Sequence, residues 1–190
     1  MILDILTKFN CRRKIFLTPE HPFCSYSTEF KVMYTSAVTM QAKLNRNIKP
    51  LNNFELERLM KYGLKMNAGD IAWALRNLNE HETVVEYILD NLKTGEEKII
   101  FLMDLVNVAM ADKFISPEEN EFALKFALKL GVSENIYELV KKYIVCAFED
   151  NVKECCELAK IIKNLYPKIE LIDLKYFALQ IYESVECTQR

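Results

Sequence analysis

Three acidic residues near the middle of the chain have the types and spacing that could bind a cation. Asp104, Asp112 and Glu119 flank a corner between two expected helices. Hard divalent cations take oxygen ligands from clustered carboxylates, so these three residues are candidate metal ligands. Asp104 also stands inside an apolar run, where an unpaired buried carboxylate is costly, so it must have a partner.

A structural role explains the same acidic residues. Ser116, Pro117 and Glu119 have the pattern of a helix start: serine as the N-cap, proline at the first helical position and glutamate three residues after the cap. Asp112 can accept backbone N–H bonds at a helix end, and Asp104 can bond a nearby amide or lysine. The structural and the metal-binding interpretations both stay open, and a divalent cation is the one cofactor that the sequence suggests.

A calcium-binding EF-hand is a rival interpretation of the corner. Ile115 and Glu119 fit the eighth and twelfth positions of its loop, and Asp112 fits the fifth. The third position would be Met110, which has no oxygen ligand in its side chain, and the sixth, which needs glycine, would be Lys113. The sequence therefore argues against a working EF-hand.

The sequence carries no motif of a known enzyme chemistry. His21 and His81 lie far apart and belong to no Glu-x-x-His pair, and there is no glycine-rich phosphate loop and no Gly-x-Ser-x-Gly elbow. The six cysteines have neither metal-ligand spacing nor a secretory disulfide framework, which predicts reduced thiols in a cytoplasmic protein. We therefore expect a non-enzymatic protein, with a metal-dependent enzyme as the less favoured alternative.

Helical periodicity on both sides of the corner supplies the elements that must position these residues. The helix expected from Glu96 to Ala111 is apolar on nearly every face, so other helices should surround it. The helix after the corner should end at Gly131 in a left-handed conformation. Apolar residues at three- and four-residue spacing continue to a last helix expected from Ile169 to Val185. The pattern predicts an all-α compact bundle of about seven or eight helices.

A helix–corner–helix unit recurs faintly at a spacing of about 67 residues. Asn45 falls on Asp112, and Gly63 falls one residue short of Gly131. We therefore expect two degenerate repeats, of which the first has lost the acidic corner. Trp73, in the helix that follows the first repeat, is interpreted as a core residue.

The sequence of the corner is similar to that of the tellurite-resistance TerB-like family. Residues 111–119 read ADKFISPEE after an apolar helix. The family's signature is an Ala-Asp-Gly turn, a branched residue, Ser or Pro, and an acidic residue that opens the next helix. Asp112 matches the family's aspartate and Glu119 its glutamate. Lys113 stands where the family usually has glycine, which argues against a left-handed backbone at this point.

The resemblance implies a non-enzymatic interaction or sensing module of a stress-response system such as tellurite resistance. A protein partner and a peripheral association with a membrane complex are implied with it. The corner would then be the recognition surface for a cation or a basic partner. Its acidic residues are Asp112, Glu118, Glu119 and Glu121. A structural subunit that forms a homodimer and binds no ligand is the alternative function.

Composition favours a compact, helix-rich protein. The chain of 190 residues is 51% apolar and has only four glycines and five prolines. Its net charge of −2 gives no general nucleic-acid footprint, and no apolar run reaches the length of a membrane span without a charge. We expect a cytoplasmic protein with a partly irregular arm over residues 1–30, anchored by aromatic residues such as Phe23 and Tyr26, and one helical domain over residues 31–190.

Overall fold

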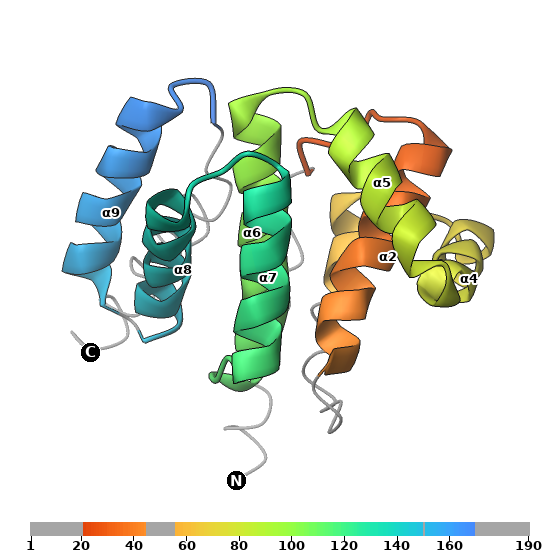
Figure 1. Ribbon diagram of the computed structural model, residues 1–190, viewed down its shortest axis with the longest axis horizontal. Coiled ribbons are helices and arrows are strands. Elements are labelled where there is room, and N and C mark those ends of the chain that lie inside the picture. The colour runs from red at the N-terminus through yellow and green to blue at the C-terminus, as the bar shows by residue number, and fades with distance from the viewer. Residues whose placement is uncertain (1–20, 45–55, 150, 170–190) are drawn as a thin grey trace, which may run out of the picture.

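The computed structural model describes residues 21–44, 56–149 and 151–169, and these form helices without a strand (Figure 1). The helices are α2 (Thr28–Leu44), the π-helical η1 (Arg58–Gly63), α4 (Ala68–Arg76), the 3-10 helix η2 (Asn77–Asn79), α5 (His81–Asn91), α6 (Gly95–Ala109), the 3-10 helix η3 (Met110–Asp112), α7 (Pro117–Lys129), α8 (Glu134–Phe148) and α9 (Val152–Leu165). The predicted all-α bundle is confirmed. None of the described helices is both long and apolar enough to cross a lipid bilayer.

Two predicted features lie outside the described residues. One is the corner of the first repeat, which includes Asn45, and the other is the helix expected from Ile169 to Val185, of which only Ile169 is described. The first twenty residues of the expected arm also lie outside them. Residues 21–27 of the arm are described, and they form turns that lead into α2.

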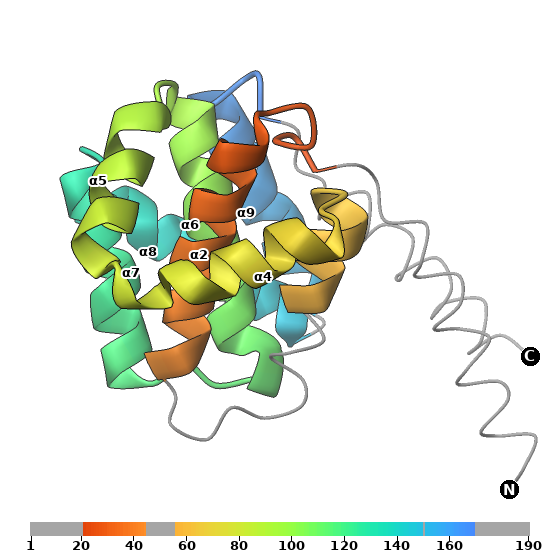
Figure 2. The same cartoon turned by 90° about the vertical axis from the view of Figure 1, so that its right-hand side faces the viewer.

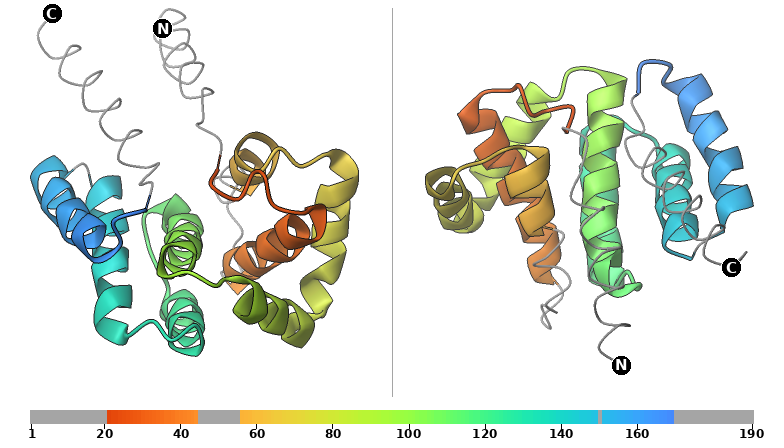
Figure 3. Two further views of the ribbon diagram at one scale, coloured as in Figure 1. Left: turned by 90° about the horizontal axis from the view of Figure 1, so that it is seen from above. Right: turned by 180° about the vertical axis from the view of Figure 1, so that it is seen from behind.

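Two helices, α2 and α6, lie side by side at the centre of the bundle (Figures 2 and 3). The apolar helix α6 contacts α2, α7 and α8, and its side chains Phe101, Leu102 and Leu105 are fully buried. The prediction that other helices surround this segment is therefore confirmed. Because α6 contacts both halves of the bundle, a polar side chain on one of its buried faces must find a partner inside the protein.

Helix α2 is buried although it is rich in hydroxyl side chains. The Ser36 hydroxyl lies 2.8 Å from the Val32 carbonyl of its own helix and 3.0 Å from the Ala74 carbonyl of α4. The Thr39 hydroxyl donates to the Thr35 carbonyl at 2.7 Å. Each of these hydroxyls has a backbone acceptor, so α4, α5 and α6 can cover α2 without leaving them unpaired.

The two halves of the bundle use the same local signals in the same order. Helix α2 begins after Ser27, whose hydroxyl accepts the Phe30 N–H at 3.1 Å, and α6 begins after Thr94, whose hydroxyl accepts the Glu97 N–H at 3.2 Å. Thr94 and Glu97 together form a capping box at the start of α6.

The second helix of each half ends at a left-handed residue. Gly131 has a φ of 75°, as predicted, and in the first half Lys65 has a φ of 52°. The structural counterpart of Gly131 is therefore Lys65 and not Gly63. The reason is the π-helical bond from the Leu64 N–H to the Leu59 carbonyl, at 2.8 Å, which carries the helix past Gly63.

Trp73 lies on the surface, so the prediction that it belongs to the core is wrong. Its side chain is 39% exposed, whereas Ala74 is fully buried. Neighbouring residues of a helix point about 100° apart. Because α4 turns Ala74 towards Ser36 of α2, the indole one position earlier must point elsewhere.

The last described helix, α9, lies at the edge of the bundle and packs mainly against α8 (Figure 1). The Tyr166 ring, just after α9, covers Gly95 at the start of α6. A Cβ atom at Gly95 would lie 2.8 Å from Tyr166 Cε1. Glycine therefore lets the end of α9 approach the start of α6 closely.

We expect Gly95→Ala to lower the free energy of unfolding by about 1–2 kcal/mol, because the added methyl group overlaps the Tyr166 ring. Urea denaturation measures this change. In the double variant with Tyr166→Leu, the loss should be smaller than the sum of the two single losses. Additive losses would show that the two residues do not interact.

Candidate functional site

The Asp104 carboxylate joins α6 to α2 and to the segment before α2. Its Oδ2 atom accepts the Tyr34 hydroxyl at 2.6 Å and the His21 Nε2–H at 2.9 Å. Tyr34 is fully buried, and the side chains of His21 and Asp104 are only 9% and 16% exposed. This contact supplies the partner that a carboxylate in an apolar helix requires.

The bonds of His21 fix its tautomer. Its Nδ1 atom accepts the backbone N–H of Phe23 at 3.2 Å, so the ring proton must sit on Nε2, where it points to Asp104. The backbone N–H of His21 donates to the Gly63 carbonyl at 3.1 Å. Both ring nitrogens are bonded within the protein, so the His21–Asp104 pair anchors the segment before α2 to α6.

A second anchor lies two turns earlier on the same side of α6. The Tyr26 hydroxyl donates to Glu97 Oε1 at 2.6 Å, and Glu97 also caps α6 through Thr94. This bond, together with burial and the charge of Glu97, raises the pKa of Tyr26 to about 12. The segment from His21 to Ser27 is therefore fastened at two points along α6, and the predicted anchoring role of Tyr26 is confirmed.

The corner between α6 and α7 has a defined backbone. Lys113 has a φ of 67°, and its N–H donates to the Met110 carbonyl at 2.7 Å. The expectation that a lysine here avoids the left-handed region is therefore wrong. The chain must reverse between η3 and α7, and it does so with lysine in a conformation that costs a residue with a Cβ atom about 1–2 kcal/mol.

The predicted capping box that starts α7 is confirmed. The Ser116 hydroxyl accepts the Glu119 N–H at 3.2 Å, and Glu119 Oε2 accepts the Ser116 N–H at 2.8 Å. Glu119 is fully buried, and its carbonyl accepts the Gln41 Nε2–H at 3.0 Å, which joins α7 to α2. The Glu119 side chain therefore faces the interior and does not contribute to the outer surface of the corner.

Other residues of the corner are exposed. Phe114 is 62% exposed, and Glu118 and Glu121 are exposed on the first turns of α7. Glu121 Oε1 lies 2.6 Å from Lys125 Nζ, and this hydrogen bond and the lysine charge lower the pKa of Glu121. The outer surface of the corner thus combines one aromatic ring with two carboxylates.

The three predicted metal ligands differ in their surroundings. Asp104 bonds His21 and Tyr34, and Glu119 belongs to the capping box of α7. The side chain of Asp112 is outside the described part of the structure. Within that part, no group of three or more His, Cys, Asp or Glu side chains could hold a metal ion. A cation site at Asp104, Asp112 and Glu119 stays a prediction.

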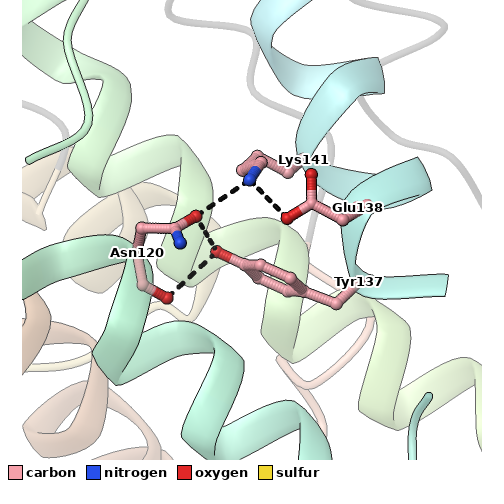
Figure 4. Close-up of polar contacts among 4 residues, drawn as sticks. All are labelled: Asn120, Tyr137, Glu138 and Lys141. Carbon is pink, nitrogen blue, oxygen red and sulfur yellow. Dashed lines mark hydrogen bonds and ion pairs between the residues drawn. The ribbon is translucent and has the colours of Figure 1, made fainter. Parts of the chain in front are cut away.

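A polar network between α7 and α8 was not predicted from the sequence (Figure 4). Asn120 Oδ1 accepts the Tyr137 hydroxyl at 3.0 Å and the Lys141 ammonium at 2.9 Å, and Lys141 also pairs with Glu138. Burial and the charge of Glu138 raise the pKa of Tyr137, so its hydroxyl stays a donor. The network fastens α7 to α8, and no spacing pattern along the chain could have revealed it.

Cys24, Cys146, Cys155 and Cys156 form no disulfide within the part of the chain that the structure describes. Cys146 and Cys155 are buried in the α8–α9 hairpin. Burial and a hydrogen bond to Glu154 raise the pKa of the Cys146 thiol. The reactive thiolate is therefore disfavoured at Cys146.

The bond between His21 and Asp104 was missed because the two residues are 83 positions apart. The one signal in the sequence was Asp104 itself, a carboxylate in an apolar helix that required some partner. Nothing in the spacing of the chain identified His21 as that partner.

Comparison of the chain with protein-family models, with curated proteins and with solved structures gave no match. The resemblance to the TerB-like family therefore stays a prediction from the sequence of the corner.

Tyr26→Phe tests the second anchor through its pH dependence. The folded pKa of Tyr26, about 12, exceeds its ordinary value of 10.0, so the stability linked to this group is fully present below pH 10 and is lost as the pH rises towards 12. We expect the wild type to exceed Tyr26→Phe in unfolding free energy by a constant amount from pH 7 to 9, and by less above pH 10. Urea denaturation at each pH measures the difference, and a gap that widens above pH 10 would contradict the assignment.

Proposed function

We propose that this chain is a non-enzymatic interaction module of a stress-response system, as its resemblance to the TerB-like family implies. The observation that carries the proposal is the outer surface of the corner, where Phe114, Glu118 and Glu121 are exposed on a fixed backbone. We name these three residues the corner surface. Of the four acidic residues expected at the corner, Glu119 is turned inward, and the side chain of Asp112 lies outside the described part of the structure.

The fixed backbone of the corner between α6 and α7 supports a binding role. The left-handed Lys113 and the Ser116–Glu119 capping box hold the backbone on either side of Phe114. A surface that is already ordered loses little conformational entropy when a partner binds. Exposed aromatic side chains supply much of the binding energy in protein interfaces, and carboxylates at the rim select a basic partner. The partner that fits is a protein segment with a basic residue next to an apolar one.

The buried polar groups support a role without catalysis. His21 uses both ring nitrogens within the protein, and Cys146 has a raised pKa. The Tyr34 hydroxyl has a pKa well above its ordinary value because of burial and the nearby Asp104 charge. These groups are held in states that stabilise the fold, and none of them is prepared to exchange protons with a substrate.

Site-specific photo-crosslinking in cells tests the proposal. A photoreactive phenylalanine derivative at position 114 should give a discrete protein adduct. The same derivative at position 128 is the matched control, since Leu128 is 54% exposed on α7 away from the corner. The adduct from position 114 should fall several-fold in the background Glu118→Lys/Glu121→Lys, because reversed charges repel a basic partner.

Circular dichroism of each variant shows whether helix content is retained. Equal adducts from positions 114 and 128, or an adduct at 114 that survives the charge reversal in a folded variant, would contradict a role for the corner surface.

A further inference from the structure

A groove of about 280 Å³ opens between the end of α2, η1 and α4, in the region where α4 packs across α2 (Figure 2). Buried apolar side chains form its floor, namely Ala42, Leu56 and Met60. Ile71 and Leu75 of α4 form a wall, and Leu75 is 47% exposed. The groove is therefore apolar and open to solvent.

Two of the helices that line the groove are unusual. Within α4 only Ala74 is buried, so the apolar side chains of Ile71 and Leu75 are left beside the groove and not in the core. Helix η1 has the π-helical form, which is rare and frequent at functional sites, and it supplies Met60 and Lys61 to the lining. Both features are typical of a surface that receives a ligand.

The lining carries one positive charge without a partner. Glu57 and Lys61 form an ion pair with each other across one helical turn. Lys43 is exposed in the same lining, and no carboxylate among the residues that the structure describes forms an ion pair with it. The groove therefore combines an apolar floor with one ammonium group that is available to an anion.

The polar groups of the lining favour an alkyl chain over a peptide. A peptide brings backbone N–H and C=O groups, which need partners when they lose water. The Thr39 hydroxyl already donates to the Thr35 carbonyl at 2.7 Å, and Glu57 and Lys61 are paired with each other. The described lining also has no aromatic ring on which a planar group could stack. A saturated chain that ends in one anionic group matches these features.

We propose that this groove binds the alkyl chain of a medium-length fatty acid, with the carboxylate at Lys43. Ligand sites have volumes of about 300–1,000 Å³, with mostly apolar linings and a few polar groups that fix the orientation of the ligand. The groove lies at the small end of this range, which fits a single alkyl chain. Because one side of the chain stays in solvent, the affinity is modest, with saturation between high micromolar and millimolar concentrations.

Titration of the full chain with hexanoate, octanoate and decanoate tests the apolar part of the groove. NMR chemical shifts of the Ile71 and Leu75 methyl groups measure each dissociation constant. Each added methylene should lower it by up to about fourfold, the effect of burying one CH₂ group. Decanoate should bind more tightly than decanol, and decylamine should bind most weakly, because Lys43 attracts a carboxylate and repels an ammonium group.

Two variants separate the charge from the apolar wall. Lys43→Gln should raise the dissociation constant of decanoate by about threefold and leave that of decanol unchanged, since only an exposed ion pair is lost. Lys129→Gln, at an exposed site at the end of α7, is its matched control. Leu75→Ser should weaken both ligands several-fold, whereas Leu128→Ser, at a position 54% exposed on α7, should weaken neither. Circular dichroism shows that each variant is folded.

No saturable binding of decanoate at millimolar concentration would overturn the proposal, and this is also the result if residues 45–55 of the same chain cover the groove. Decylamine that binds as tightly as decanoate, or Lys43→Gln without effect, would overturn it too. An acidic, apolar peptide that shifts the same methyl groups where decanoate does not would assign the groove to a protein partner instead. The groove shares no residue with the corner surface, so the proposed function is tested separately.

Discussion

The arrangement of this bundle depends on one largely buried carboxylate, that of Asp104. Asp104 lies on α6, the most central helix, where an unpaired charge would be strongly destabilising. Its Oδ2 atom accepts hydrogen bonds from Tyr34 of α2 and from His21, which precedes α2. The need to satisfy this carboxylate therefore fixes the position of α2 against α6 and places the segment from His21 to Ser27 across both.

Aromatic packing extends this centre into the second half of the bundle. The Tyr34 ring lies 5.3 Å from the Phe101 ring of α6, which lies 5.1 Å from the Phe126 ring of α7. Both pairs meet edge to face, the arrangement that aromatic quadrupoles favour. The hydroxyl of Tyr34 thus satisfies Asp104 while its ring belongs to the core, so one residue links the polar centre to the apolar packing.

Local signals in the sequence predicted local structure well. The capping box at Ser116 and the left-handed Gly131 depend only on residues a few positions apart, and both are present. The predictions for Trp73 and Lys113 were wrong because tertiary packing decided them: α4 turns Ala74 inward, and the chain reversal before α7 requires a left-handed residue whatever its type.

The sequence predicted the candidate site less well than it predicted the fold. The exposure of Glu118 and the burial of Glu119 follow from where α7 packs, although the capping pattern had already identified the role of Glu119. The bond between His21 and Asp104 joins segments that no periodicity relates. The centre of the bundle thus uses the ionisable side chains of His21, Tyr34 and Asp104 to hold its own helices together.

The most direct test of this account is nitrogen-15 NMR of the histidine rings at neutral pH. We predict that His21 is a single tautomer with the proton on Nε2 and a bare Nδ1, and that the Nε2 proton exchanges slowly with water. His81, which is exposed at the start of α5, serves as the internal reference with averaged tautomers. A proton on Nδ1 of His21, or averaging like that of His81, would contradict the anchoring role of Asp104.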